Sequence, residues 1–200
     1  AELVFGMTVM MARNLYNGTS GTELKGKKLG IHAFGQVGRN VARIAKGFGM
    51  EVFAFDPYCP ASVMEAEGVK PITDINELYS TCQYVSLHIP ATNETKKSIN
   101  YALLKQMPKG AMLINTARKE VINEEELVQI MDERPDFRYV SDITPDNASV
   151  FAEKFTGRYF FTPKKMGAQT AEANINAGIA AAKQSVGFLK EGIDKFKVNK

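Results

Sequence analysis

A run of six residues beginning at Ala33 has the spacing of a phosphate-binding turn. It reads Ala-Phe-Gly-Gln-Val-Gly, which is the dinucleotide fingerprint G-x-G-x-x-G with alanine in the first glycine position. Gly35 would let the backbone approach a pyrophosphate, and Gly38 would let the following helix pack closely on the preceding strand. The backbone amides of Gln36 and Val37, at the start of that helix, would face the anion. The run predicts a pyrophosphate site, although the glycines of an ordinary tight turn would give the same pattern.

An acidic residue at the end of the next expected strand supports a dinucleotide. Asp56 follows Gly35 by 21 positions, and a carboxylate there can accept hydrogen bonds from both hydroxyls of an adenosine ribose. The same negative charge would repel a 2′-phosphate, so the pattern favours NAD over NADP. The simpler alternative is that Asp56-Pro57 only begins a turn.

The apolar pattern around these residues alternates between strands and helices. Strands are expected at 29–33, 51–55, 84–87, 111–115, 137–141 and 159–162. Helices are expected at 2–15, 37–48, 61–67, 75–79, 101–106, 124–133 (capped by Asn123) and 171–190. In the second of these the apolar residues share one face, which we expect to be buried: Val37, Val41, Ile44, Ala45 and Phe48. Such alternation predicts an α/β fold of the Rossmann type, a doubly wound parallel sheet with helices on both faces and ligand sites at the carboxyl ends of its strands.

Composition and charge exclude several classes of protein. The 200 residues carry a net charge of +3 with scattered basic residues, so neither nucleic acid nor a membrane surface is an expected partner. The longest apolar run, residues 3–12, is shorter than the roughly 18 residues that a transmembrane helix needs. Cys59 and Cys82 match neither a zinc site nor a disulfide scaffold, which predicts no metal and a reducing, cytoplasmic location.

Longer stretches of the chain match one enzyme family. The stretches are residues 21–30, Gly-Thr-Glu-Leu-Lys-Gly-Lys-Lys-Leu-Gly; Ser86-Leu-His-Ile-Pro90 with Thr92 and Thr95; residues 107–118, Met-Pro-Lys-Gly-Ala-Met-Leu-Ile-Asn-Thr-Ala-Arg; and residues 162–173. Together they cover nearly the whole chain, and they resemble the D-2-hydroxyacid dehydrogenase family. Within that family they are most similar to the branch that oxidises 3-phosphoglycerate with NAD in serine biosynthesis. The resemblance implies a two-domain oxidoreductase of which this chain is the cofactor-binding part.

The resemblance also implies roles for individual residues. Arg118 would hold the substrate carboxylate and carbonyl oxygen, and Asp142 would orient the carboxamide of the nicotinamide. His88 would line the adenine pocket, whereas the sequence pattern alone favours packed histidines at both His32 and His88. The residues expected to bind the cofactor are Gly35, Gln36, Val37, Gly38, Asp56, Pro57, His88, Ile89, Pro90, Thr95, Thr116, Ala117, Arg118, Asp142 and Gly167.

The catalytic pair that the resemblance implies, a histidine and a glutamate, is replaced in this chain. The two positions hold Lys165 and Asn147, and Lys164 is one extra residue in the same loop. A base works best when its pKa is near the working pH, so a lysine would need desolvation and positive neighbours such as Arg118. A carboxylate neighbour would oppose this, so the loss of the glutamate accords with a lysine. We expect Lys165 to be the acid and base of the reaction, with Lys164 as the alternative register.

The expected organisation is one NAD-binding domain over residues 1–192, with a leading helix at 1–15 and an exit helix at 170–192. Residues 193–200 would begin the return to a substrate domain whose main part is absent, so the chain alone should not turn over substrate. The resemblance implies that the leading helix helps to pair two cofactor domains in a homodimer. Two other functions stay open: a dehydrogenase for another 2-hydroxy acid, of the glyoxylate or hydroxypyruvate reductase type, and a module that senses NAD without catalysis.

Overall fold

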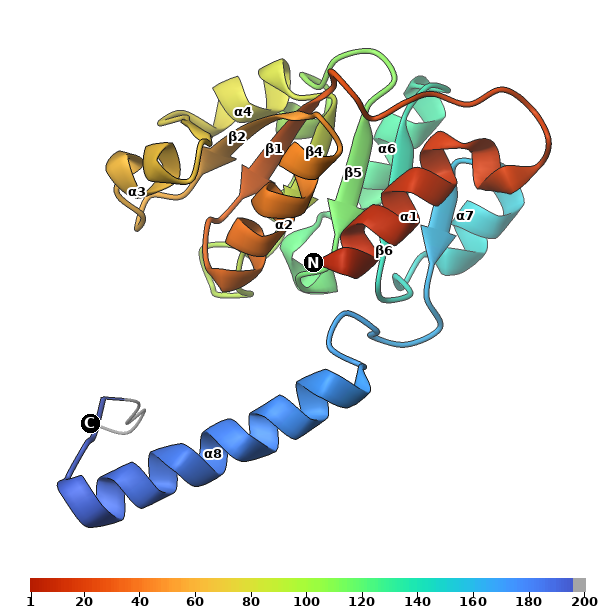
Figure 1. Cartoon of the computed structure of the whole chain (residues 1–200). Coiled ribbons are helices and arrows are strands. Elements are labelled where there is room, and N and C mark those ends of the chain that lie inside the picture. Colours follow the sequence, from red (N-terminus) through yellow and green to blue (C-terminus); the bar gives the residue numbers. More distant parts are fainter. Residues whose placement is uncertain (196–200) are drawn as a thin grey trace. The chain divides into compact units, whose positions relative to one another are not determined.

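The computed structural model describes residues 1–195, which divide into two compact units that separate after Lys165. The first unit is built on a seven-stranded sheet (Figure 1). Its strands are β1 (Lys28–His32), β2 (Glu51–Phe55), β3 (Lys70–Pro71), β4 (Tyr84–Leu87), β5 (Met112–Asn115), β6 (Arg138–Ser141) and β7 (Tyr159–Phe161). Its helices are α1 (Glu2–Ala12), α2 (Gln36–Gly47), α3 (Ala61–Ala66), α4 (Ile75–Thr81), α5 (Tyr101–Leu104), α6 (Glu124–Glu133) and α7 (Ala148–Lys154), with 3-10 turns η1 (Asn14–Tyr16) and η2 (Lys119–Val121).

All neighbouring strands of the sheet are parallel, in the order β3-β2-β1-β4-β5-β6-β7. The chain builds outward from β1 to β3, crosses back to β4 beside β1, and then builds outward the other way to β7. Loops that leave β1 and β4 therefore diverge, and α/β proteins bind ligands at such a reversal. The doubly wound parallel sheet predicted from the alternation of elements is confirmed.

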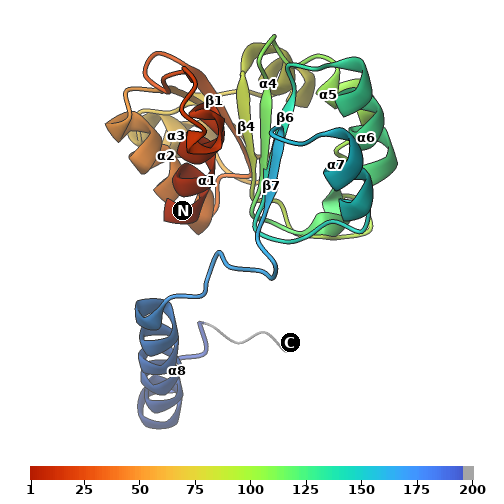
Figure 2. The same ribbon diagram turned by 90° about the vertical axis from the view of Figure 1, so that its right-hand side faces the viewer.

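Two layers of helices cover the two faces of the sheet. Figure 2 shows α1, α2 and α3 on one face and α4, α5, α6 and α7 on the other. Each layer has its own buried apolar cluster: the first includes Met11, Val41 and Met64, and the second includes Leu127 and Phe151. Because β4 and β5 have helices on both sides, every one of their residues is buried.

Helix α1 is a packed helix of the core layer, and it ends earlier than the sequence predicts. Its buried side chains pack beside α2 and over β6. The predicted end at residue 15 is wrong, because Asn14, Leu15 and Tyr16 all have positive φ angles. Arg138 makes two hydrogen bonds at this end of the helix: it donates to the carbonyl of Met11 and to the side-chain oxygen of Asn14.

Two expectations about helix surfaces and caps are also wrong. The side chains of Val37 and Phe48, expected on the buried face of α2, are 49% and 40% exposed, because Gly38 rather than Val37 is at the contact with β1. Asn123 precedes α6 but makes no capping hydrogen bond through its side chain. Glu124, the first residue of α6, contacts the start of another helix: its carboxylate accepts the backbone N–H groups of Asp146 and Asn147, which precede α7.

The second unit contains α8 (Ala171–Glu191), one residue longer than predicted at its end. The helix begins after Thr170, whose hydroxyl accepts the N–H of Ala173 at 3.0 Å, and it ends at Gly192 with a left-handed φ of 67°. The return segment expected at 193–200 lies largely outside the described residues. No helix within residues 1–195 is both long enough and apolar enough to cross a membrane.

The contact between α2 and β1 should be sensitive to a single methyl group. A Cβ atom at Gly38 would lie 2.4 Å from the carbonyl oxygen of Ala33, whereas one at Gly47, also in α2, would meet nothing within 4 Å. We expect Gly38→Ala to lower the free energy of unfolding by about 1–3 kcal/mol. Gly47→Ala, the matched control, should be neutral or slightly stabilising because alanine favours helix. Thermal unfolding of both variants tests this, and equal melting temperatures would contradict it.

Candidate functional site

The turn between β1 and α2 has the shape that an anion needs. Gly35 immediately precedes α2, and a Cβ atom there would point into open space. The first amides of a helix have no partner within the helix, so those of Gln36 and Val37 are available to a pyrophosphate beside Gly35. Gly38 brings the helix against the strand.

Ala33 takes the conformation that the missing fingerprint glycine would take. Its φ angle is +80°, in the left-handed region that disfavours residues with a Cβ atom. Two hydrogen bonds flank it: Ala33 N–H donates to the carbonyl of Phe55 at 2.9 Å, and Phe34 N–H donates to the carboxylate of Asp56 at 2.8 Å. The end of β2 thus holds the turn that follows β1.

A cavity of about 560 Å³ opens beside this turn, between the ends of β1, β2 and β4. Asp56 is at its rim, with its second oxygen accepting the N–H of Tyr58 at 2.9 Å. Phe55, Tyr58 and Ile75 give it walls that sequence analysis did not single out, although their positions at strand and helix ends could have indicated them. Seven of the predicted cofactor-binding residues line this one cavity: Gly35, Asp56, Pro57, His88, Ile89, Pro90 and Thr95.

Two histidines in the cavity wall are uncharged. His32 Nδ1 lies 3.3 Å from the hydroxyl of Tyr79, and His88 Nε2 lies 3.0 Å from the hydroxyl of Ser86. Burial lowers the pKa of His32 to about 4 and that of His88 to about 3. Both rings are neutral at physiological pH, so they contribute polar, uncharged surface beside Asp56.

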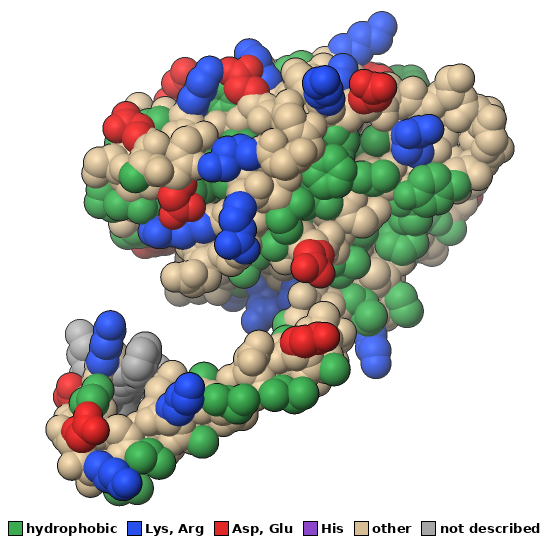
Figure 3. All heavy atoms as spheres, in the orientation of Figure 1, with side chains coloured by type: hydrophobic (Ala, Val, Ile, Leu, Met, Phe, Trp, Pro, Cys, Tyr) green, Lys and Arg blue, Asp and Glu red, His purple; other side chains and the backbone are tan. Residues whose placement is uncertain are grey.

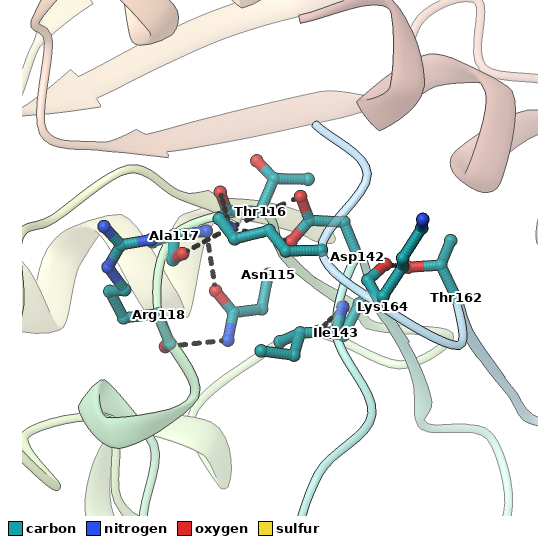
Figure 4. Close-up of polar contacts among 10 residues, drawn as sticks. Asn115, Thr116, Ala117, Arg118, Asp142, Ile143, Thr162 and Lys164 are labelled. Atoms are coloured by element: carbon teal, nitrogen blue, oxygen red, sulfur yellow. Dashed lines mark hydrogen bonds and ion pairs between the residues drawn. The ribbon is translucent and has the colours of Figure 1, made fainter. Parts of the chain in front are cut away.

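A second group of predicted residues lies at the ends of β5 and β6 (Figure 4). The buried side chain of Asn115 shapes this group: its oxygen accepts the N–H of Ala117 at 2.9 Å, and its amide donates to the carbonyl of Arg118 at 3.0 Å. This fixes the backbone of residues 116–118. Asn115 was not among the residues predicted from the sequence, and the signal that could have indicated it is an asparagine at the end of an apolar strand.

Lys165 makes the central contacts of this group. Its ammonium donates to the carbonyl oxygens of Ala117 and Thr116 at 2.6 and 3.1 Å, and to the carboxylate of Asp142 at 3.0 and 3.3 Å. Asp142 is completely buried. The loss of the glutamate therefore does not leave Lys165 without a carboxylate neighbour: the glutamate position holds Asn147, but Asp142 supplies a negative charge.

Lys164 is directed differently. Its side chain is exposed and points away from Asp142 in Figure 4, while its carbonyl accepts the hydroxyl of Thr162 at 2.8 Å. Of the two lysines, Lys165 is the one that meets Asp142 and the β5 loop. The other position in question, Asn147, donates its backbone N–H to Glu124 at 3.0 Å. The predicted Gly167 belongs to the second unit.

Two side chains at this site are available for hydrogen bonds to a ligand. Thr116 Oγ1 is buried without any hydrogen-bond partner among the described residues, and buried hydroxyls without a partner are uncommon. The guanidinium of Arg118 is exposed and makes no hydrogen bond or ion pair within residues 1–195. Together with the open space at Gly35, these groups fit a dinucleotide and leave a guanidinium available to a further anion.

The sheet order, the turn at its reversal and the carboxylate after β2 define a dinucleotide-binding domain. The chain belongs to the D-isomer specific 2-hydroxyacid dehydrogenase family, whose NAD binding domain matches residues 5–158. This confirms the family and the cofactor expected from the sequence.

Named relatives agree with this family. The D-3-phosphoglycerate dehydrogenase of Methanocaldococcus jannaschii is 32% identical over all of this chain and 40% of the relative, and that of Haemophilus influenzae is 30% identical over all of this chain and 52% of the relative. The crystal structure of NAD⁺-bound 3-phosphoglycerate dehydrogenase from Entamoeba histolytica has a TM-score of 0.91 and 46% identity, covering all of this chain and 63% of that one. The chain thus spans about two fifths to one half of these two curated relatives.

The two histidines of the cavity wall should make stability depend on pH. In the unfolded chain a histidine binds a proton near pH 6.5, whereas His32 and His88 in the fold do so only near pH 4 and pH 3. The unfolded state therefore binds more protons between these values, and stability should fall as pH decreases below about 6.5. Melting temperatures between pH 7.5 and pH 5 measure the effect, since carboxylates titrate mainly below this window. His88→Asn should flatten the profile; an identical slope in this variant would contradict the assignment.

Proposed function

We propose that this chain is the cofactor domain of an NAD-dependent dehydrogenase that oxidises 3-phosphoglycerate. The observation that carries the proposal is the placement of an exposed Arg118 on the loop after β5 whose carbonyl oxygens bind Lys165, which also pairs with Asp142 at the end of β6. A guanidinium recognises a carboxylate through two parallel hydrogen bonds, and a nearby amine can exchange a proton with a hydroxyl. The phosphorylated substrate is supported by the D-3-phosphoglycerate dehydrogenases among the relatives.

The cofactor would be held by residues on both sides of the sheet reversal. Asp56 would accept the ribose hydroxyls, and the amides after Gly35 would bind the pyrophosphate. Thr116 Oγ1 and the carboxylate of Asp142 would meet the nicotinamide end. When bound, NAD supplies the acceptor for the hydride that leaves the substrate carbon.

The substrate would be handled by two cationic side chains. Arg118 would hold the substrate carboxylate and so orient the hydroxyl-bearing carbon. Lys165, as the free amine, would take the hydroxyl proton onto Nζ as the carbonyl forms. This division of roles is proposed for the complete enzyme, because the chain spans only part of its relatives.

We also propose that two copies of the chain pair through this domain, in a reducing compartment such as the cytoplasm. Hydrophobic side chains gather on the face that carries α1 (Figure 3). A shallow hollow along the edge strand β7 is lined by Leu15 and Phe160, next to Tyr16, which is 65% exposed. An apolar patch at a sheet edge suits a symmetric partner, and Cys59 and Cys82 are free thiols.

The dimer should be seen by sedimentation velocity. We expect the chain to sediment as a dimer at micromolar concentration, and Tyr16→Glu to shift it toward monomer because a charge would be placed in the apolar contact. A chain that stays monomeric at every concentration would contradict the pairing.

Cofactor preference should depend on the charge of Asp56. Calorimetric titration should show that the chain binds NAD at least about tenfold more tightly than NADP, because the carboxylate repels a 2′-phosphate. Asp56→Asn keeps an oxygen for the N–H of Phe34 but loses the charge, so the ratio of the two affinities should fall toward one. Glu153→Gln, which removes an exposed charge on α7, is the control and should keep the ratio. Equal wild-type affinities would overturn the ribose assignment.

The two cationic roles can be separated in the complete enzyme with 3-phosphoglycerate. Arg118→Ala should lower kcat/KM by at least about a hundredfold, because charge-assisted hydrogen bonds to the substrate are lost. Lys165→Ala should lower kcat by about a hundredfold to ten-thousandfold, the range for loss of a general base. Lys164→Ala should stay near wild type. A panel of other 2-hydroxy acids tests the substrate, and a better substrate among them would replace 3-phosphoglycerate while leaving the reaction class intact.

A further inference from the structure

The contacts of Lys165 use all of its hydrogen-bonding capacity. An ammonium has three donors, and four oxygen atoms from three residues lie within 3.3 Å of Nζ. Those oxygens belong to separate segments, the loop after β5 and the end of β6. They converge on one position, which a single donor nitrogen can fill.

The acceptors are rigid and the lysine is the movable partner. Asp142 is fully buried at the end of β6, and the carbonyls of Thr116 and Ala117 belong to a loop held by the side chain of Asn115. Lys165 instead follows β7 in a loop, and its side chain is 35% exposed on a flexible four-carbon stem. If another donor takes this position, the lysine is the group that moves.

The nicotinamide end of the cofactor brings such a donor. The carboxamide N–H₂ is the sole hydrogen-bond donor of the nicotinamide ring, and it needs acceptors such as a carboxylate or a carbonyl. The oxygens of Asp142, Thr116 and Ala117 are therefore the acceptors that both the carboxamide and the ammonium require.

We propose that Lys165 and the nicotinamide carboxamide compete for these acceptors, so that cofactor binding displaces the lysine ammonium. This inference rests on the proposed function. It gives Lys165 a second role as a positioning residue: it is a partner of buried Asp142 that the carboxamide would replace. The displaced ammonium can then release a proton to water and face the substrate hydroxyl as the free amine. The dinucleotide must therefore bind before the base is available.

If the two groups compete, removing the lysine should raise the affinity for ligands that carry a nicotinamide and leave the affinity for a ligand without one unchanged. Calorimetric titrations would use NAD, NADH and ADP-ribose, which lacks the nicotinamide, with the wild-type chain, Lys165→Met and Lys165→Gln. In Lys165→Met the affinities for NAD and NADH should rise about fivefold to tenfold, the worth of roughly one net hydrogen bond, while that for ADP-ribose stays within twofold. Lys164→Met is the matched control and should leave all three affinities unchanged.

NADH separates competition from simple charge repulsion, because its ring is neutral whereas that of NAD is positive. Tightening of NAD without tightening of NADH would overturn the proposal in favour of repulsion. Unchanged or weaker NADH binding in both Lys165 variants, with ADP-ribose still bound, would overturn it and leave the proposed function standing. Lys165→Gln keeps a donor for Asp142, so it carries the test if melting curves show that Lys165→Met does not fold. If the wild-type chain binds none of the three ligands, the proposed function itself fails.

Discussion

The parallel direction of all seven strands is the constraint on which the site depends. Parallel strands deliver their carboxyl ends to one edge of the sheet, so residues far apart in the chain must meet there. Asp56 after β2 reaches the turn after β1, and Asp142 after β6 reaches the lysine after β7. Neither contact needs the two partners to be close in sequence. The helices on both faces then bury the strands and keep those ends in register.

The site has two halves, one mainly apolar around Asp56 and one mainly ionic around Asp142. Around Asp56 the cavity is mostly apolar, its histidines are neutral, and the carboxylate of Asp56 accepts two backbone N–H groups. Around Asp142 the groups are ionic, with a buried carboxylate, a lysine paired to it and an exposed guanidinium. A buried carboxylate needs a positive or donor partner at all times. Lys165 is one of the partners that meet this requirement at Asp142.

Local patterns predicted the fold and the phosphate turn well, and long-range contacts are what they missed. The fingerprint has a fixed short spacing, and Asp56 is marked by its place at the end of an apolar strand, so both could be predicted from the sequence. The pairing of Lys165 with Asp142 joins residues 23 positions apart, with α7 and β7 between them. The hydrophobic periodicity of a sequence does not indicate a contact between such distant residues. Helix α7 escaped prediction because it is seven residues long with one buried side chain, Phe151. Strand β3 has only two residues, one of them a proline.

Ala33 links backbone geometry to nucleotide selectivity. A left-handed conformation costs a residue with a Cβ atom about 1–2 kcal/mol, and the hydrogen bond from Phe34 N–H to Asp56 holds the chain in it. The carboxylate that would discriminate between nucleotides thus also stabilises the turn. An engineer who wished to convert this domain to a 2′-phosphorylated cofactor could not treat position 56 as independent. Glycine at position 33 would first have to remove the backbone strain, and only then could position 56 take a residue whose side chain has no acceptor for the N–H of Phe34.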